Sequence, residues 1–229
     1  MKTLPNDPNL LDKKSLSMQI LYRGVSKIPI IPSIRRYNLT ISHEQKFVWY
    51  RVAKVGTRTI LNHLRQSGVC LDVEHASRLH YPVNSFKDYF KFAFVRNPWD
   101  RLVSCWRDKV INNNLFNFDS TNLEQMKKFE NFVDFASSLD IDRCNRHLRS
   151  QSSLIDLNRV DYLGRLETFE DDANHIFDEI GIASQKIVRK NVTCRKKTYQ
   201  EHYSDQLAEK VAEIYQKDIQ IFGYQFETE

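Results

Sequence analysis

A lysine, a glycine and two threonines stand close together in one short stretch of the chain. In order, the stretch reads Lys54, Val55, Gly56, Thr57, Arg58 and Thr59. A lysine ammonium, threonine hydroxyls and the open backbone around a glycine are donors that suit an anion such as phosphate. We therefore predict an anion-binding loop. It is not a Walker A loop, because the lysine precedes the glycine and the pattern GxxxxGK followed by Ser or Thr is absent.

A second set of candidate residues consists of Arg96 and Ser104. An arginine guanidinium can hold a phosphate through two parallel hydrogen bonds, and a serine hydroxyl can complete the coordination. The two sets together suit a ligand that carries two separate anionic groups.

The first set requires a turn from a strand to a helix. Residues 47–52 form an aromatic and β-branched run typical of a buried strand, and Ile60, Leu61 and Leu64 follow at helical spacing. A helix that begins at Thr57 offers unpaired N–H groups and the positive end of its dipole to the loop.

The second set requires the same kind of turn. Residues 92–95 indicate a strand, and Pro98 marks the start of an amphipathic helix. Arg96 then leaves its strand at the carboxyl end, where open α/β sheets bind their ligands. The charges of this helix, including Asp108 and Lys109, also fit a solvent-exposed, salt-bridged face.

Both stretches resemble motifs of sulfotransferases. Lys-x-Gly-Thr-x-Thr is similar to their 5′-phosphosulfate loop. The second stretch resembles their 3′-phosphate motif in the form found in carbohydrate sulfotransferases, the group of the chondroitin, dermatan and HNK-1 enzymes. The matching residues are Phe94, Val95, Arg96, Pro98, Arg101, Leu102, Val103, Ser104 and Lys109. Two further segments are similar to the family, with Leu163, Gly164, Arg165 and Glu167 in one, and Tyr215, Asp218, Phe222, Gly223 and Tyr224 in the other.

The resemblance implies an α/β, P-loop-like sulfotransferase fold, with a central parallel sheet flanked by helices. It implies 3′-phosphoadenosine 5′-phosphosulfate (PAPS) as the co-substrate, no metal, and a hydroxyl acceptor belonging to a glycan. Lys54 would be the catalytic cation, residues 54–59 would hold the 5′-phosphate, and Arg96 with Ser104 would hold the 3′-phosphate. Strand-turn-helix alternation supports the α/β class independently.

A general base should lie between the two motifs, since the acceptor hydroxyl must lose a proton. We choose His80, with His75 and Glu74 as alternatives. By resemblance, His147 and Gln151 lie near the acceptor side of the cleft, and a structural role for them is equally compatible with the sequence.

Composition sets further expectations. We divide the chain into an N-terminal arm, residues 1–42, packed on a sulfotransferase domain, residues 43–229. The net charge of +5 suits an anionic ligand, as do the basic residues between 189 and 197. The four cysteines are scattered and indicate neither a zinc site nor a disulfide framework.

The sequence shows neither a signal peptide nor an apolar run of the roughly 20 residues that span a bilayer. We therefore expect a soluble, cytoplasmic protein without a membrane span or nucleic-acid partner, although animal members of the resembled family are anchored Golgi proteins. The alternative functions are a P-loop-type kinase, disfavoured by the missing Walker A loop, and a non-catalytic module that binds polyanions.

Overall fold

A computed structural model of the chain describes residues 17–21, 24, 37–79, 83–182 and 198–226. A five-stranded sheet forms its centre, with the order β3-β1-β2-β4-β5. The strands are β1 (Tyr37–Ser42), β2 (Phe47–Tyr50), β3 (Val73–Leu79), β4 (Phe90–Val95) and β5 (Tyr162–Arg165). The pairs β2–β4 and β4–β5 are parallel, whereas β1 is antiparallel to β2 and β3. Four strands thus run in one direction, and the predicted α/β class is confirmed.

Strand β1 corrects the boundary of the predicted arm. The sequence pattern places residues 37–42 in the arm, but in the structure they pair with two other strands of the sheet. The polar side chains that alternate along β1 are buried too, and the hydroxyls of Thr40 and Ser42 donate to the carbonyls of Glu74 and Cys70 at 2.6 and 2.7 Å. Most of residues 1–36 lie outside the described part of the chain, so their packing stays a prediction.

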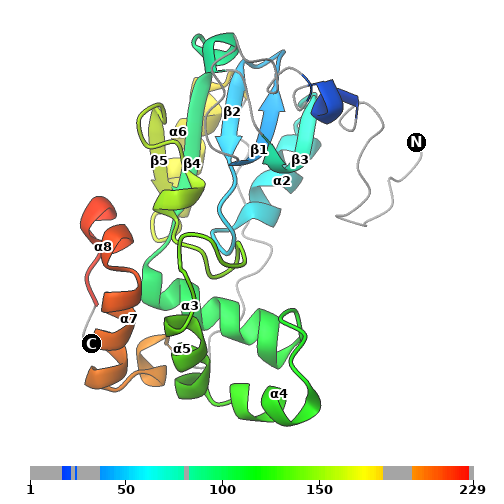
Figure 1. Cartoon of the computed structure of the whole chain (residues 1–229). Helices are drawn as coiled ribbons and strands as arrows, with labels where there is room; N and C mark the ends of the chain where they lie inside the picture. The colour runs from blue at the N-terminus through cyan, green and yellow to red at the C-terminus, as the bar shows by residue number, and fades with distance from the viewer. Residues whose placement is uncertain (1–16, 22–23, 25–36, 80–82, 183–197, 227–229) are drawn as a thin grey trace.

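The helices flank the sheet and extend beyond one end of it (Figure 1). They are α2 (Thr57–Gln66), α3 (Pro98–Trp106), α4 (Ser120–Met126), α5 (Phe129–Ser137), α6 (Phe169–Glu179), α7 (Asp205–Ile214) and α8 (Gln216–Phe222). Short 3-10 turns occur at Val83–Phe86 (η1), Ser152–Leu154 (η3) and Gln200–His202 (η4), and one turn of π-helix, η2 (Arg107–Ile111), continues α3. Figure 1 shows α3, α4, α5 and α7 gathered beyond the ends at which β2 and β4 leave the sheet. No helix in the described ranges has the length and apolar character needed to cross a bilayer.

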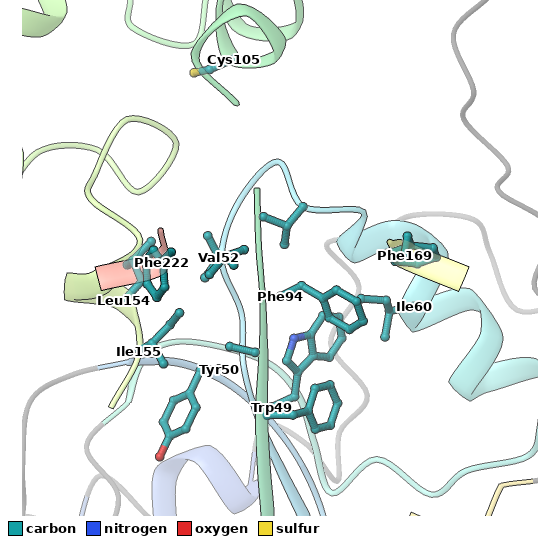
Figure 2. Packing of buried hydrophobic residues seen from close by; sticks show 14 of the residues in the cluster. Trp49, Tyr50, Val52, Ile60, Phe94, Cys105, Leu154, Ile155, Phe169 and Phe222 are labelled. Carbon is teal, nitrogen blue, oxygen red and sulfur yellow. The ribbon is translucent and has the colours of Figure 1, made fainter. Parts of the chain in front are cut away.

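Aromatic side chains pack on both faces of β4. Phe94 and Trp49 lie on one face with Phe169 of α6, and the Phe94 and Phe169 rings are 5.3 Å apart (Figure 2). Leu154 and Phe222 lie on the other face. Because both faces are covered, β2 and β4 are buried, and the loops at their carboxyl ends begin at the edge of the core.

Gly164 allows β5 to lie against this core. A Cβ atom at Gly164 would come within 2.7 Å of the Phe94 ring. The glycine of the predicted Leu-Gly-Arg segment therefore has a packing reason, since any larger residue would push Phe94 out of place.

Candidate functional site

The two predicted anion-binding elements lie in contact at the carboxyl ends of neighbouring parallel strands. Arg96, which follows β4, donates from Nη1 to the carbonyl oxygen of Lys54 at 3.0 Å. Arg101 of α3, only 2% exposed, donates from Nε to the carbonyl of Ala53 at 3.1 Å. Two arginines of the second motif thus form hydrogen bonds to the backbone of the first loop. This is the arrangement expected from the rule that ligands bind beyond the carboxyl ends of parallel strands.

Lys54 has an unusual backbone conformation and a paired side chain. Its φ of 74° lies in the left-handed region, which few residues other than glycine adopt. Its Nζ atom lies 2.9 Å from Oδ2 of Asp108, and its side chain is 13% exposed. Burial lowers the pKa of Lys54, and the charge of Arg96 acts in the same direction, while Asp108 opposes both.

Asp108 binds a second lysine as well. Its Oδ2 atom lies 3.2 Å from Nζ of Lys109. Burial works against ionisation of Asp108, but Lys54 and Lys109 outweigh it, so the pKa of Asp108 is lowered. The sequence pattern predicts an exposed helix face for Asp108, since its partner Lys54 is 54 positions away in the chain.

The rest of the loop is arranged around the start of α2. Gly56 has φ +80°, and a Cβ atom there would lie 3.1 Å from the Phe169 ring, so both backbone and packing require glycine. The Thr57 hydroxyl donates to the Val52 carbonyl at 2.9 Å, which closes the loop. Gly56 is the N-cap, and its carbonyl accepts from Thr59 N at 2.9 Å.

The remaining loop residues contribute mainly backbone. The side chain of Val55 is buried in the core, and that of Arg58 is exposed. Among the described residues we find no acceptor for the N–H groups of Gly56, Thr57 and Arg58. These three groups at a helix start can bind an anion.

Arg96 is buried, with 6% exposure, and engaged within the protein. Its Nε and Nη2 atoms lie 2.9 and 2.7 Å from Oδ2 of Asp100, besides the bond from Nη1 to Lys54. The guanidinium carries five N–H groups, and each of its three nitrogens takes part in one of these contacts. Ser104 is half-buried and lies one turn after Asp100 on the same face of α3.

Gln151 and Asp218 hold the backbone of Arg96 in place through a chain of hydrogen bonds. The Gln151 side-chain amide accepts from Arg96 N at 3.0 Å and donates to Arg96 O at 2.8 Å. The carboxylate of Asp218, which is fully buried, accepts from the backbone N–H groups of Gln151 and Ser152 at 2.6 and 2.9 Å. Gln151 therefore has the structural role that the sequence left open.

His147 faces the same group of cations. Arg101 donates from Nη2 to the carbonyl of the neighbouring Arg146 at 3.4 Å, which ties this turn to the Lys54 loop. The buried Nδ1 atom of His147 has no hydrogen-bond partner among the described residues. Burial lowers the pKa of His147 to about 3, helped by the charges of Lys109, Arg146, Lys54 and Arg101.

The structure describes only some of the predicted general bases. His80 lies outside the described residues, and for His75 only the backbone, in β3, is described. The Glu74 carboxylate forms an ion pair with Arg65 of α2. The basic residues between 189 and 197 also lie outside the described part of the chain.

The described residues at this site are mainly cationic. The cations are Lys54, Arg96, Arg101, Lys109 and Arg146, and the carboxylates among them are Asp100 and Asp108. Over the described ranges, no group of three His, Cys, Asp or Glu side chains could hold a metal ion. Such a site has the charge needed to attract a ligand with several negative charges.

The chain is similar to known sulfotransferases. Residues 37–225 match the family described as Sulfotransferase family. Carbohydrate sulfotransferase 10 of Homo sapiens is 28% identical over 171 residues, covering 61% of this chain and 48% of the human protein. The Xenopus laevis protein of the same name is 27% identical over 186 residues, covering 67% and 51%. Carbohydrate sulfotransferase 11 of Mus musculus is 26% identical over 167 residues, covering 60% and 47%.

The chain spans about half the length of these curated relatives. No solved structure matches it with statistical significance. The family match covers most of the chain, including both predicted anion-binding elements. The chain therefore belongs to the sulfotransferase family, whose members are PAPS-dependent transferases.

Proposed function

We propose that this protein transfers the sulfuryl group of PAPS to a hydroxyl group of a carbohydrate, by in-line displacement. The observation that carries the proposal is the hydrogen bond from Arg96 Nη1 to the Lys54 carbonyl, because it brings the two predicted anion-binding elements into contact. Family membership supports the donor. The carbohydrate acceptor is inferred from the names of the relatives.

The donor set fits a nucleotide with phosphates at its 3′ and 5′ positions. The N–H groups of Gly56, Thr57 and Arg58, with Thr59 and Lys54, would hold the 5′-phosphosulfate. Arg96 and Ser104 would hold the 3′-phosphate, which distinguishes PAPS from ATP. Asp100 keeps part of the Arg96 guanidinium occupied and so fixes its plane.

When bound, PAPS supplies an activated sulfuryl group with a stable bisphosphate as the leaving group. The acceptor oxygen forms a bond to sulfur while the bond from sulfur to the bridging oxygen breaks, and the hydroxyl proton passes to a general base. Lys54 would donate to the bridging oxygen, where negative charge develops. Such a contact is stronger in the transition state than in the ground state, and it therefore raises kcat.

His80 remains our choice for the general base. Glu74 is the weakest of the three candidates, since its carboxylate is already paired with Arg65. The cytoplasmic location expected from the sequence also stays a prediction.

Two measurements test the proposal. Calorimetry should show that adenosine 3′,5′-bisphosphate binds more tightly than adenosine 5′-monophosphate by at least about tenfold, since the 3′-phosphate adds charge-assisted hydrogen bonds. Labelled PAPS offered with a panel of glycans should then label at least one of them. A preference for ATP with Mg²⁺ over the bisphosphate would contradict the proposal and favour a kinase. Equal binding of unrelated polyanions without transfer would favour a binding module.

A further inference from the structure

Asp108 stands between two lysines at the mouth of the Lys54 loop. Its Oδ2 atom lies 2.9 Å from Lys54 Nζ and 3.2 Å from Lys109 Nζ. The exposed fractions of these three side chains lie between 13 and 24%. One carboxylate oxygen therefore holds together the ammonium groups of two lysines that are far apart in the sequence.

A π-helical turn brings Asp108 to this position. Residues Arg107–Ile111 form η2 directly after α3, and Asn112 N donates to the Arg107 carbonyl at 3.0 Å, the spacing of a π-helix. The side chain of Asn113 donates to the Asp108 carbonyl at 2.7 Å and holds the end of the turn. Single π-helical turns are rare in proteins, and those that occur often lie at functional sites.

The other groups around Lys54 do not share the role of Asp108. Arg96 and Lys109 are cationic, and His147 is neutral because burial and nearby cations lower its pKa to about 3. Burial raises the pKa of the Cys105 thiol to about 12, so it too is neutral near pH 7. Asp108 is thus the carboxylate paired with Lys54, whereas the other carboxylate named at this site, Asp100, is paired with Arg96.

We propose that Asp108 is a positioning residue for Lys54, which holds the Lys54 ammonium in its charged form and aims it, with Lys109, into the site before the nucleotide binds. This inference rests on the proposed function, in which Lys54 stabilises the leaving oxygen. Asp108 itself contacts neither substrate nor reacting atoms in this role. It acts through the two lysines.

The sign of the effect follows from the charges. Burial and Arg96 favour the neutral amine of Lys54, and Asp108 opposes them. Replacing the carboxylate by an amide removes the opposing charge, so Lys54 should lose its proton at lower pH. A single opposite charge at this range shifts a pKa by about 1 to 3 units.

The direct test measures the ionisation of Lys54 without turnover. Trace acetylation with acetic anhydride, followed by mass spectrometry of the Lys54 peptide, gives the fraction of neutral amine at each pH against a small amine standard. In Asp108→Asn the midpoint should move to lower pH by about one unit or more. The control is Asp134→Asn, which breaks the exposed pair with Lys210 and should leave the Lys54 midpoint unchanged. An unchanged midpoint in a folded Asp108→Asn variant would overturn the inference.

Steady-state kinetics and binding separate this inference from the proposed function. Asp108→Asn should lower kcat about tenfold or more because the Lys54 ammonium is no longer held in position. The alkaline limb of its pH profile should move to lower pH together with the Lys54 midpoint. Binding of adenosine 3′,5′-bisphosphate should be unchanged or tighter, because a negative charge has left the site. Asp108→Glu should restore part of kcat. If the wild type transfers sulfate but the pH profile of Asp108→Asn is unshifted, the role of Asp108 is refuted and the proposed function stands. If the wild type neither transfers sulfate nor binds the bisphosphate, the proposed function itself is refuted.

Discussion

At the scale of single residues, Lys54 combines a strained backbone with a buried charge. A left-handed φ costs a residue other than glycine about 1 kcal/mol or more. Contacts on both sides hold this conformation, since Arg96 donates to the Lys54 carbonyl and Asp108 binds its ammonium. Glycine would suit the backbone better. A lysine in this position therefore indicates that its side chain is needed.

Replacing Lys54 tests that need. In Lys54→Met the side chain keeps its length and apolar part but loses its charge, so kcat for sulfate transfer should fall about 100-fold or more, as when one oxyanion donor is removed. Initial rates with labelled PAPS measure the effect. The melting temperature should stay close to that of the wild type, because Asp108 keeps Lys109 as its partner.

The control for this variant is Lys217→Met, since Lys217 is about half-exposed on α8. It should keep the full rate. A Lys54→Met protein that is folded and transfers sulfate at the wild-type rate would show that another group stabilises the leaving oxygen.

The sequence could identify Lys54 and Arg96 but not the residues that hold them. Both belong to short local patterns, in which a strand, a turn and a helix start follow one another. Asp108 and Gln151 act on partners that are 54 and 55 positions away. No local periodicity in the sequence predicts such long-range contacts. From the sequence, Asp108 therefore looks like a surface charge, and Gln151 is compatible with either a structural or an acceptor-side role.

At the scale of elements, a hydrogen-bonded relay joins α8 to the end of β4. Asp218 of α8 binds the backbone of Gln151 and Ser152, and Gln151 binds both backbone groups of Arg96. All of these groups are buried. Because buried polar groups are costly to leave unpaired, the relay fixes the place at which Arg96 leaves the sheet.

Removing the middle of the relay should weaken nucleotide binding from a distance. In Gln151→Ala the N–H and carbonyl of Arg96 lose their partners, and we expect the free energy of unfolding to fall by about 1 to 3 kcal/mol. We also expect adenosine 3′,5′-bisphosphate to bind about tenfold more weakly, since Arg96 is no longer held in place. Urea unfolding and calorimetry measure the two effects.

The matched control is Gln220→Ala, because Gln220 is exposed on α8. It should change neither quantity. A Gln151→Ala protein with lower stability but unchanged affinity would limit the relay to a role in folding.

The elements themselves were predictable where hydrophobic periodicity is regular. The strands and helices on both sides of Gly56 and Asn97 carry apolar residues at the expected spacing, and the structure confirms them. Strand β1 was missed because its polar positions are buried as well, and prolines stand before it in the chain. The apolar residues between positions 123 and 135 belong to two helices, α4 and α5, with Lys128 as the N-cap of α5. The π-helical turn could not be predicted, because five residues are too few to show a period.

At the scale of the whole molecule, the fold concentrates positive charge at one end of the sheet. Parallel strands deliver the Lys54 loop and Arg96 to the same edge, and α3, η2 and the turn at His147 add further cations there. Like charges held close together oppose the compact state. The protein offsets this repulsion in part by keeping His147 neutral.

That arrangement predicts how stability depends on pH. Burial and the surrounding cations lower the pKa of His147 from 6.5 to about 3 in the folded protein. Between these values the unfolded chain binds a proton that the folded chain does not, so stability should fall as the pH is lowered from 6.5 towards 3. The slope contributed by one such group is about 1 kcal/mol per pH unit. In His147→Asn that contribution is absent, and urea unfolding at pH 7, 6 and 5 should show a shallower loss than in the wild type.

Adenosine 3′,5′-bisphosphate provides the second half of the test. Its negative charges would offset Lys54, Lys109 and their neighbours, so His147 should accept a proton more easily in the complex and the acid loss of the wild type should become smaller. In His147→Asn, the bisphosphate should raise the stability by binding but should leave the dependence of stability on pH unchanged. The control is His175→Asn, because His175 is exposed on α6 and lies outside the group of cations. Equal slopes in wild type and His147→Asn would mean that other groups govern the acid response, whereas a slope that depends on both His147 and the bisphosphate would link the neutral imidazole to the occupied site.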